Sequence, residues 1–354
     1  MTGVDVVVPC YNYGRYLDWC VGTLLNQASV RVRVLIIDDA SEDDTPQIGE
    51  HLAAGDSRVE FRRHQTNAGH VATFNEGLLD WASAEYSLLI SADDGLAPGA
   101  LARATQLMTA HPDIGMAYGM ATIITEDHGP GPGEGADPEY RIVNTSRFLE
   151  RCCRVGNPVP SPTAVVRTGV QQRLGGYRAD LPHSGDMEMW MRFALDGAVG
   201  VLGAVQGYYR WHGRNLSSAY YARAVGDLRQ RVLAFRPLES RLRAAVPEFA
   251  AWFTSMCDRL GTQALWIAHD AFESGDDERY RECLAFAAEV HSSLRQSGVW
   301  KRLKMKQLLG RRAVRRLRPV LSWLRGETAS PELPRTGAGF RAGASTGWWP
   351  DESL

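Results

Sequence analysis

The sequence lacks the features of a membrane-spanning, secreted or disulfide-linked protein. No apolar run reaches the roughly 18 residues that a membrane-spanning helix needs. The first residues, MTGVDVVVPCYN, contain no basic region followed by a long apolar stretch, so we expect no secretion signal. The six cysteines are scattered without a CxxC pair, which is typical of free thiols in a reducing compartment. We therefore expect a cytoplasmic protein.

Lysine is almost absent, and its distribution shows a charge asymmetry. The chain has 39 lysines and arginines, but its three lysines all lie within residues 301–306. Residues 301–325 contain ten basic residues and no acidic one, so the rest of the chain is more acidic than the net charge of −2 suggests. A basic segment on an acidic body indicates contact with a partner.

The segment WKRLKMKQLLGRRAVRRLRPVLSWLR (300–325) spaces apolar residues among its cations, as an amphipathic helix does. Three interpretations remain open: peripheral contact with an anionic membrane, packing on the acidic body of the same chain, and a role in a homo-oligomer. Gly310 and Pro319 argue against one continuous helix. We expect no nucleic-acid binding, because no basic stripe occurs elsewhere.

The first part of the chain alternates strand and helix patterns. The predicted strands cover 4–9, 30–39, 58–64 and 86–91, and the predicted helices between them cover 15–28, 44–54 and 70–83. Such alternation is typical of an α/β fold with a mostly parallel sheet and helices on both faces. From about residue 218 the pattern is almost wholly helical. A chain of 354 residues with 44% hydrophobic content most simply forms two domains.

Polar residues follow three of the predicted strands. The first strand leads to Tyr11-Asn12, the second ends on Asp38-Asp39, and the fourth ends on Asp93-Asp94. In parallel α/β sheets, ligands bind beyond the carboxyl ends of the strands. The sequence therefore predicts that these residues share one ligand-binding edge.

The paired aspartates allow both a functional and a local interpretation. Asp93 and Asp94 suit a hard divalent cation, which takes oxygen ligands together with substrate phosphates. They could equally form a solvated Asp-Asp-Gly turn. Asp38-Asp39 could be a polar turn before a helix, or Asp39 could accept a hydrogen bond from a nucleobase or a ribose. The segment TNAGHVATFNEG (66–77) adds small residues at a loop-to-helix junction, where backbone amides can approach a ligand.

An ordered set of motifs resembles the family 2 glycosyltransferases. The motifs are VVVPCYN, LIIDDASEDDT, NAGHVATFNEG and LLISADD, followed by SPTAVVRTGVQQRLGGYRADLPHSGDMEMWMRFALDG and YRWHGRNLS. The similarity covers roughly residues 3–217. It implies a GT-A fold, a Rossmann-like arrangement, and an inverting transfer from a nucleotide-sugar donor, most often UDP- or dTDP-linked.

The resemblance also implies roles for residues at the strand ends. Pro9, Tyr11 and Asn67 would contact the nucleotide, and Asp39 would face the base. Asp93 would contact ribose or metal, and Asp94 would bind Mg²⁺ or Mn²⁺. Many family members carry an earlier aspartate where this sequence has Ser91, so only the last two carboxylates of that motif are present.

A second set of residues lies further along the chain. The resemblance makes Asp186 the general base that takes the proton of the acceptor, although Gly185 stands where the family typically has glutamate. Asp186 could instead be an acid that stabilises a helix N-terminus, and Glu188 is a rival base. Trp190 and His183 are candidate acceptor-binding residues. His212 would serve the metal or the diphosphate, unless it is structural.

We therefore expect four segments: a GT-A domain over 1–217, a helical region over 218–298, a basic amphipathic segment over 299–325, and a disordered tail over 326–354 that includes Trp348-Trp349. The expected acceptor carries a hydroxyl or an amine and could be a saccharide, a lipid carrier, a peptide or a small natural product. The alternatives are a sugar nucleotidylyltransferase and a non-catalytic nucleotide-sugar-binding protein.

Overall fold

The β-branched runs near the N-terminus form the parallel half of a mixed β-sheet. The computed structural model describes residues 1–126, 129, 139–215, 218, 220, 223, 225–325 and 342–347. Its first four strands are β1 (Gly3–Cys10), β2 (Arg31–Asp38), β3 (Val59–Arg63) and β4 (Tyr86–Leu89). Strand β1 pairs in parallel with β2 and β4, and β2 pairs in parallel with β3. The carboxyl ends of these strands therefore meet at one edge, as the sequence predicts.

The second half of the sheet contains antiparallel pairs. Its strands are β5 (Gly95–Leu96), β6 (Ile114–Ile124), β7 (Tyr140–Val143), β8 (Val165–Arg167) and β9 (Ala198–Arg210). The order is β3-β2-β1-β4-β8-β6-β9-β5, with β7 beside β9. Strand β8 is antiparallel to both β4 and β6, whereas β6 and β9 are parallel. The predicted α/β class is confirmed, and the sheet is mixed.

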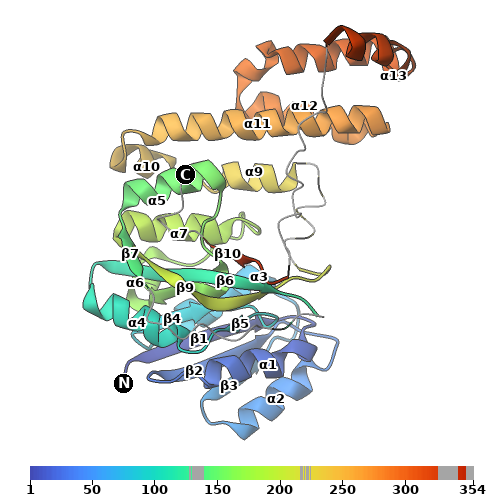
Figure 1. Cartoon of the computed structure of the whole chain (residues 1–354). Helices are drawn as coiled ribbons and strands as arrows, with labels where there is room; N and C mark the ends of the chain where they lie inside the picture. The colour runs from blue at the N-terminus through green and yellow to red at the C-terminus, as the bar shows by residue number, and fades with distance from the viewer. Residues whose placement is uncertain are drawn as a thin grey trace. The chain divides into compact units, whose positions relative to one another are not determined.

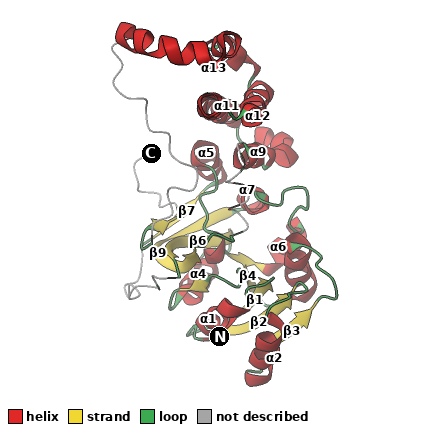
Figure 2. Ribbon diagram, turned by 90° about the vertical axis from the view of Figure 1, so that its right-hand side faces the viewer, coloured by secondary structure: helices red, strands yellow, loops and turns green. Residues whose placement is uncertain are grey.

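Helices lie on both faces of this sheet, with α1 and α2 on one side and α5 and α7 on the other (Figures 1 and 2). The helices of this part are α1 (Gly14–Leu25), α2 (Thr45–Gly55), α3 (His70–Asn75), α4 (Ala100–Ala110), α5 (Thr145–Val155), α6 (Thr168–Leu174), α7 (Gly185–Asp196) and α10 (Glu239–Ala245). A π-helical turn, Glu76–Trp81, continues α3.

The alternation of valines in β1 decides which helix packs where. Val6 and Val8 belong to a fully buried cluster with Leu17 and other apolar residues of α1. Val7 points to the opposite face and contacts Gly77 of the π-helical turn, where an added Cβ would lie only 2.3 Å from Val7 Cγ1. Glycine therefore lets this turn approach the sheet closely. The packing fixes where the loop before α3 meets the strand ends.

The chain divides into two units. The first comprises Met1–Gly213, Pro237–Val246 and Phe340–Leu354, and the second comprises Arg214–Arg236 and Pro247–Gly339. The second unit is helical, with α9 (Gly226–Leu233), α11 (Phe249–Ser274), α12 (Asp277–Val290) and α13 (Gly298–Arg325). Helix α13 is interrupted at Gly310, whose φ of 77° is not helical, as the sequence predicts. Among the described helices, none is both long enough and apolar enough to cross a membrane.

The C-terminal segment differs from the prediction of disorder where it is described. Residues 342–347 include strand β10 (Ser345–Thr346), which pairs with Ala121 and Thr122 of β6. The backbone N–H groups of Ile123 and Gly343 extend this pairing, through bonds to Ala344 O and Ile123 O. This stretch of β6 already pairs with β9 on one side, and β10 covers its other edge. The rest of the predicted tail, including Trp348-Trp349, lies outside the described residues.

Candidate functional site

The loops that follow β1 and β2 are tied to each other by hydrogen bonds. The backbone N–H of Asn12 donates to Ser41 Oγ at 2.9 Å, and Asn12 Oδ1 accepts from the N–H of Glu42 at 2.8 Å. Asn12 has a φ of 57°, a conformation that asparagine tolerates better than most residues. The preceding Tyr11 is left 46% exposed, and Pro9 is half-buried at the end of β1. The edge of the sheet thus offers an aromatic ring to solvent on a fixed loop.

The two aspartates at the end of β2 have different roles. Asp38 is fully buried, accepts the N–H of Ser41 at 2.9 Å and pairs with Arg63 at 3.1 Å, so it stabilises the loop. Asp39 reaches the loop before α3, where it accepts the N–H groups of Ala68 at 2.7 Å and Gly69 at 2.9 Å. Asn67 is exposed on the same loop. This geometry leaves Asp39, not Asp38, as the candidate for recognising a ligand.

His64 holds Asp39 from the other side. Its Nδ1 lies 2.7 Å from Asp39 Oδ1, and its Nε2 lies 2.8 Å from Glu76 Oε2. Both ring nitrogens face carboxylates, which favours the doubly protonated ring and outweighs the effect of burial, so the pKa of His64 is raised. Burial tends to raise the pKa of Asp39, but the hydrogen bonds from Ala68, His64 and Gly69 outweigh that effect. The pKa of Asp39 is therefore lowered.

Asp93 and Asp94 lie in a tight turn after β4. The N–H of Asp94 donates to Ser91 O at 3.0 Å, and Asp94 Oδ1 accepts the backbone N–H of Arg210 at 2.9 Å. The two side chains are buried, and burial together with the charge of Asp93 raises the pKa of Asp94 well above its usual range. A buried pair of adjacent carboxylates is an anionic site that a cation would stabilise.

His212 and Arg210, at the end of β9, surround this pair. His212 Nε2 lies 3.0 Å from Asp93 Oδ2, and its ring stacks on Tyr16 with centroids 5.6 Å apart. Arg210 Nε donates to the backbone oxygen of Asp93 at 3.0 Å, and its guanidinium lies over the rings of Tyr16 and Trp19. His212 therefore contacts Asp93 directly, while the Arg210 side chain holds the backbone oxygen of the same residue.

The residues at this turn fit a divalent cation in part. Asp93 Oδ1 and Asp94 Oδ2 accept no hydrogen bond within the part of the chain that the structure describes. Over the same residues, no three His, Cys, Asp or Glu side chains gather as a complete metal site. Mg²⁺ and Mn²⁺ commonly take one or two carboxylates and draw further oxygens from substrate phosphates. Two unengaged carboxylate oxygens meet that requirement.

Asp186 lies in the first turn of α7. Its Oδ2 accepts from Asn157 Nδ2 at 2.8 Å and Ser161 Oγ at 2.9 Å, and its Oδ1 accepts the N–H of Met187 at 2.7 Å. The side chain is half-buried, and burial raises its pKa despite these bonds. The rival Glu188 is buried and paired with Arg192 at 2.9 Å. Of the two carboxylates in the first turn of this helix, Asp186 is therefore the one that a substrate could reach.

The first unit is similar to known proteins in sequence and in fold. Residues 5–168 match the model of the glycosyl transferase family 2. These residues form a family 2 glycosyl transferase domain. Its sequence is 34% identical over 91 residues to the glycosyltransferase GlyG of Streptococcus pneumoniae, which covers 26% of this chain and 30% of that protein. An uncharacterised protein of Mycobacterium tuberculosis is 26% identical over 212 residues, covering 55% of this chain and 63% of its own length.

Solved structures show that the family 2 domain has the predicted GT-A fold. S. aureus TarS 1-349, determined in complex with UDP-GlcNAc, superposes with a TM-score of 0.52. The sequence identity is 20%, and the match covers 84% of this chain and 92% of the other. The chain spans 63% and 30% of the two sequence relatives, so its overlap is with part of each.

Contacts link the three groups of site residues within the first unit. His70, next to Gly69, lies with its Nε2 2.9 Å from Pro182 O, in the loop that leads to Asp186. Asn75 clamps the same loop by bonding both the N–H and the carbonyl of Tyr177. On the other side, the ring of Tyr13 packs on His212 with centroids 5.4 Å apart. The loops that carry Asp39, Asp93 and Asp186 are therefore connected through short chains of contacts.

The predicted acceptor residues differ in exposure. Trp190 is only 3% exposed and packs against Tyr177 and Phe193, so its ring belongs mainly to the core and offers an acceptor little surface. His183 is half-buried in the loop before α7. Burial of Trp190 follows from its position on the inward face of a helix that covers the sheet.

Sequence reasoning missed several residues that shape the site. His64, Asn157 and Ser161 bond directly to Asp39 or Asp186, yet none was selected. Ser161 lies in the motif SPTAVV, which contributed to the resemblance without a role for its serine. His64 follows the third strand, just as Asp39 and Asp93 follow the second and the fourth. This position at a strand end is the sequence feature that indicates His64 as a site residue.

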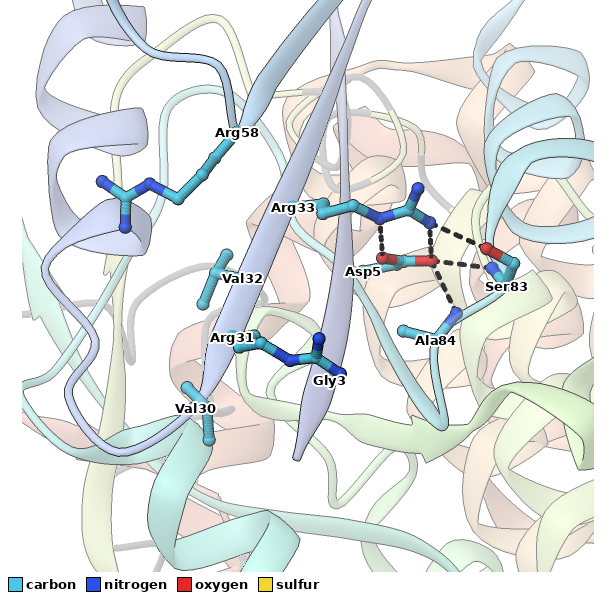
Figure 3. Close-up of a pocket in the computed structure, with 9 residues that line it drawn as sticks. All are labelled: Gly3, Asp5, Val30, Arg31, Val32, Arg33, Arg58, Ser83 and Ala84. Atoms are coloured by element: carbon cyan, nitrogen blue, oxygen red, sulfur yellow. Dashed lines mark hydrogen bonds and ion pairs between the residues drawn. The ribbon is translucent and has the colours of Figure 1, made fainter. Parts of the chain in front are cut away.

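A cavity in the first unit lies away from these residues. It is lined by Gly3, Asp5, Arg31 and Arg33, among others, at the amino ends of β1 and β2 (Figure 3). Asp5 accepts two bonds from Arg33 and the N–H groups of Ser83 and Ala84. This arrangement fixes the turn that enters β4, at the end of the strands opposite the candidate site.

Proposed function

We propose that the chain is an inverting, metal-dependent glycosyltransferase that moves a sugar from a UDP- or dTDP-linked donor to an acceptor hydroxyl or amine. The observation that carries the proposal is that Asp39, Asp93 and Asp94 all follow the carboxyl ends of the parallel strands β2 and β4, at one edge of the sheet. Open α/β sheets bind nucleotides at this edge. The fold, the family and the chemistry of these side chains support the same reaction.

The donor would bind across the loops that follow β1, β2 and β4. Asp39 would accept an N–H from the base, held ready by its bonds to the loop before α3. Tyr11 would pack against the base, while Pro9 and Asn67 would line the nucleotide on either side. Asp93 would meet the ribose or the metal. A uridine-linked donor is the first to test, because the S. aureus neighbour was solved with UDP-GlcNAc.

Asp94, with Asp93, would hold Mg²⁺ or Mn²⁺ against the diphosphate. A bound divalent cation stabilises the negative charge that develops on a leaving diphosphate. The raised pKa of Asp94 supports this role, because a buried carboxylate next to another needs positive charge nearby. His212 would orient Asp93 through its bond and could contact the diphosphate or the metal.

Asp186 would act as the general base. It would take the proton of the acceptor hydroxyl or amine as that group attacks the anomeric carbon from the face opposite the diphosphate, which inverts the configuration. A raised pKa suits a base, because proton transfer is most efficient when the pKa approaches the working pH. Asn157 and Ser161 would hold Oδ2, and Oδ1 would face the acceptor. His183 would contact the acceptor from the loop before α7.

Two measurements test the proposal. A thermal-shift screen of nucleotide sugars with and without Mn²⁺ should show a melting-point increase that requires the metal, because a ligand that binds the native state stabilises it. The anomeric configuration of the product, followed by NMR with an accepted donor, should be opposite to that of the donor. Retention of configuration would contradict the role of Asp186, and metal-independent binding would contradict that of Asp94.

A further inference from the structure

The first half of helix α13, before the break at Gly310, has one face packed on the rest of the second unit and one face in solvent. Leu303 is 1% exposed, so its side chain lies against the rest of the unit. Tyr280 of α12 donates its hydroxyl to Leu303 O at 3.1 Å. These contacts fix the rotation of the helix about its axis and therefore decide which residues face outward.

Two cations of the helix are used for this packing. Lys306 Nζ donates to Glu273 at 2.8 Å and lies 2.8 Å from His269 Nε2, both on α11. Arg311 donates to the carbonyl of Phe272 at 2.9 Å and pairs with Asp277. The interpretation that the basic segment packs on its own chain therefore accounts for Lys306 and Arg311.

The outward face carries three large apolar side chains. Met305 is 56% exposed, Leu308 is 88% exposed and Leu309 is 50% exposed. Their spacing of three and four residues places them together on one side of the helix. Among residues 225–314, whose side chains the structure describes, they are the large apolar side chains that solvent reaches most.

Four exposed cations lie near this patch in the sequence: Lys301, Arg302 and Lys304 on the same helical stretch, and Arg312 just after the break at Gly310. Unlike Lys306 and Arg311, none of the four pairs with a carboxylate in the part of the chain that the structure describes. Residues 301–325 contain no acid that could neutralise them locally. We refer to the three apolar and four basic side chains together as the α13 face.

We propose that the α13 face docks on an anionic lipid surface. Interfacial helices bury an apolar side in the lipid headgroup region, while flanking lysines and arginines contact the anionic headgroups. Lysine also keeps its charge at the surface while its methylene stem covers apolar area. The concentration of all three lysines of the chain in this helix agrees with such a surface. The proposal is independent of the transferase reaction.

A second copy of the chain is a less suitable occupant of the α13 face. A symmetric pair would place the same four cations against each other, which disfavours association. Nucleic acid would satisfy the cations but not the apolar centre. Charge and apolarity are both satisfied by an anionic bilayer.

The test is sedimentation of the full chain with vesicles. Vesicles of equal parts phosphatidylglycerol and phosphatidylcholine should bind the protein, and pure phosphatidylcholine vesicles should bind it weakly. Added salt should release it, because screening weakens exposed charges. A protein that fails to bind the anionic vesicles overturns the proposal.

Two variants separate the contributions of charge and apolarity. Replacing the four cations of the α13 face with glutamine should lower the partition coefficient on anionic vesicles by at least about tenfold, since each cation near such a surface contributes. L308S/L309S should weaken binding even at low salt. The matched controls are R279Q/R295Q, two exposed arginines elsewhere in the same unit, and V155S, an exposed apolar residue of the first unit. Circular dichroism checks that each variant is folded.

Three further results would contradict the proposal. If R279Q/R295Q lost as much vesicle binding as the variant with four glutamines, the binding would depend on overall charge and not on the α13 face. Unchanged binding of L308S/L309S would remove the apolar contribution. A wild-type dimer that L308S/L309S converts to a monomer, without vesicle binding in either, would assign the face to a second copy.

Discussion

The carboxyl edge of the parallel strands and the start of α7 both present aspartates, but they treat the charge in opposite ways. Asp39 at the strand edge is 4% exposed and receives three N–H donors, so its pKa falls. At Asp186 on α7, burial outweighs the bonds from Ser161 and Met187, so its pKa rises. The first arrangement suits a fixed acceptor of hydrogen bonds, and the second suits a group that takes up a proton. Environment, not residue type, separates the two roles.

The substitution D186N should have the largest effect on activity. The proposed base would be lost, so kcat should fall about 10²–10⁴-fold, while the affinity for the donor stays unchanged. The melting temperature should not fall, because burial makes the charge of Asp186 unfavourable. Steady-state kinetics and thermal shift with donor measure both effects. The matched control is D180N, an exposed aspartate in the preceding loop, which should retain wild-type turnover.

The substitution D94N should weaken the metal-dependent binding of the donor. With one of the two carboxylates neutral, metal-dependent donor binding should weaken about 100-fold, since a bound cation contributes several kcal/mol of charge stabilisation. Calorimetric titration of donor with and without Mn²⁺ measures this loss. If D94N kept wild-type donor affinity and metal dependence, the metal site would lie elsewhere.

The substitution D39N tests whether the strand-edge charge stabilises the fold. The folded pKa of Asp39 is lowered, so its contribution is present above the unfolded pKa of about 3.9 and is lost as the pH falls through the folded value. D39N should therefore destabilise the protein at pH 7 by about 1.5–3 kcal/mol, the range for a charged hydrogen bond. Denaturant unfolding of both aspartate variants compares them. Equal changes in the free energy of unfolding for D39N and D186N would contradict the proposed difference between the two aspartates.

His64 should make the donor edge sensitive to alkaline pH. Its folded pKa is raised, so its stabilising contribution is complete below the unfolded value of about 6.5 and is lost as the pH rises through the folded value. The wild-type melting temperature should therefore decline over that interval, both alone and with nucleotide. H64Q should lose this dependence and bind nucleotide more weakly at pH 6 than the wild type. If the melting temperature of H64Q depended on pH in the same way as that of the wild type, His64 would not have this role.

The smallest expected effect concerns Ser161. Its hydroxyl lowers the pKa of Asp186, so S161A should move the acidic limb of the kcat profile to higher pH. Loss of one hydrogen bond should change kcat at pH 7 by about two- to tenfold. A pH–rate profile of S161A beside the wild type measures the displacement. An unchanged acidic limb would mean that Asp186 does not control it.

The sequence predicted the parallel half of the fold well because its signals are local. The runs that end at Pro9, Asp39 and Asp94 each combine apolar residues with a polar stop, and parallel pairing brings such ends together. The antiparallel strands β8 and β10 were harder to predict. Strand β8 is three residues long, and β10 lies in a Gly- and Pro-rich segment that forms a strand only because β6 offers a partner.

The contacts around the site could not be read from the sequence. Residues 39 and 64, or 157 and 186, are separated by too many residues for any periodic pattern to connect them. Trp190 shows the same limit, because its aromatic ring fits an acceptor site by chemistry but is buried by the rotation of α7. Likewise, only the packing of Leu303 and Lys306 shows which cations among residues 301–312 have no carboxylate partner within the described part of the chain.

The sequence by itself determined the kind of protein: an α/β domain with carboxylates at its strand ends and a helical region that carries a basic segment. It could do so because strand periodicity, stop residues and charge are properties of neighbouring residues. Only the tertiary structure decided which aspartate holds its charge and which favours a proton. That distinction depends on burial and on donors such as His64 and Ser161, which folding brings from distant parts of the chain.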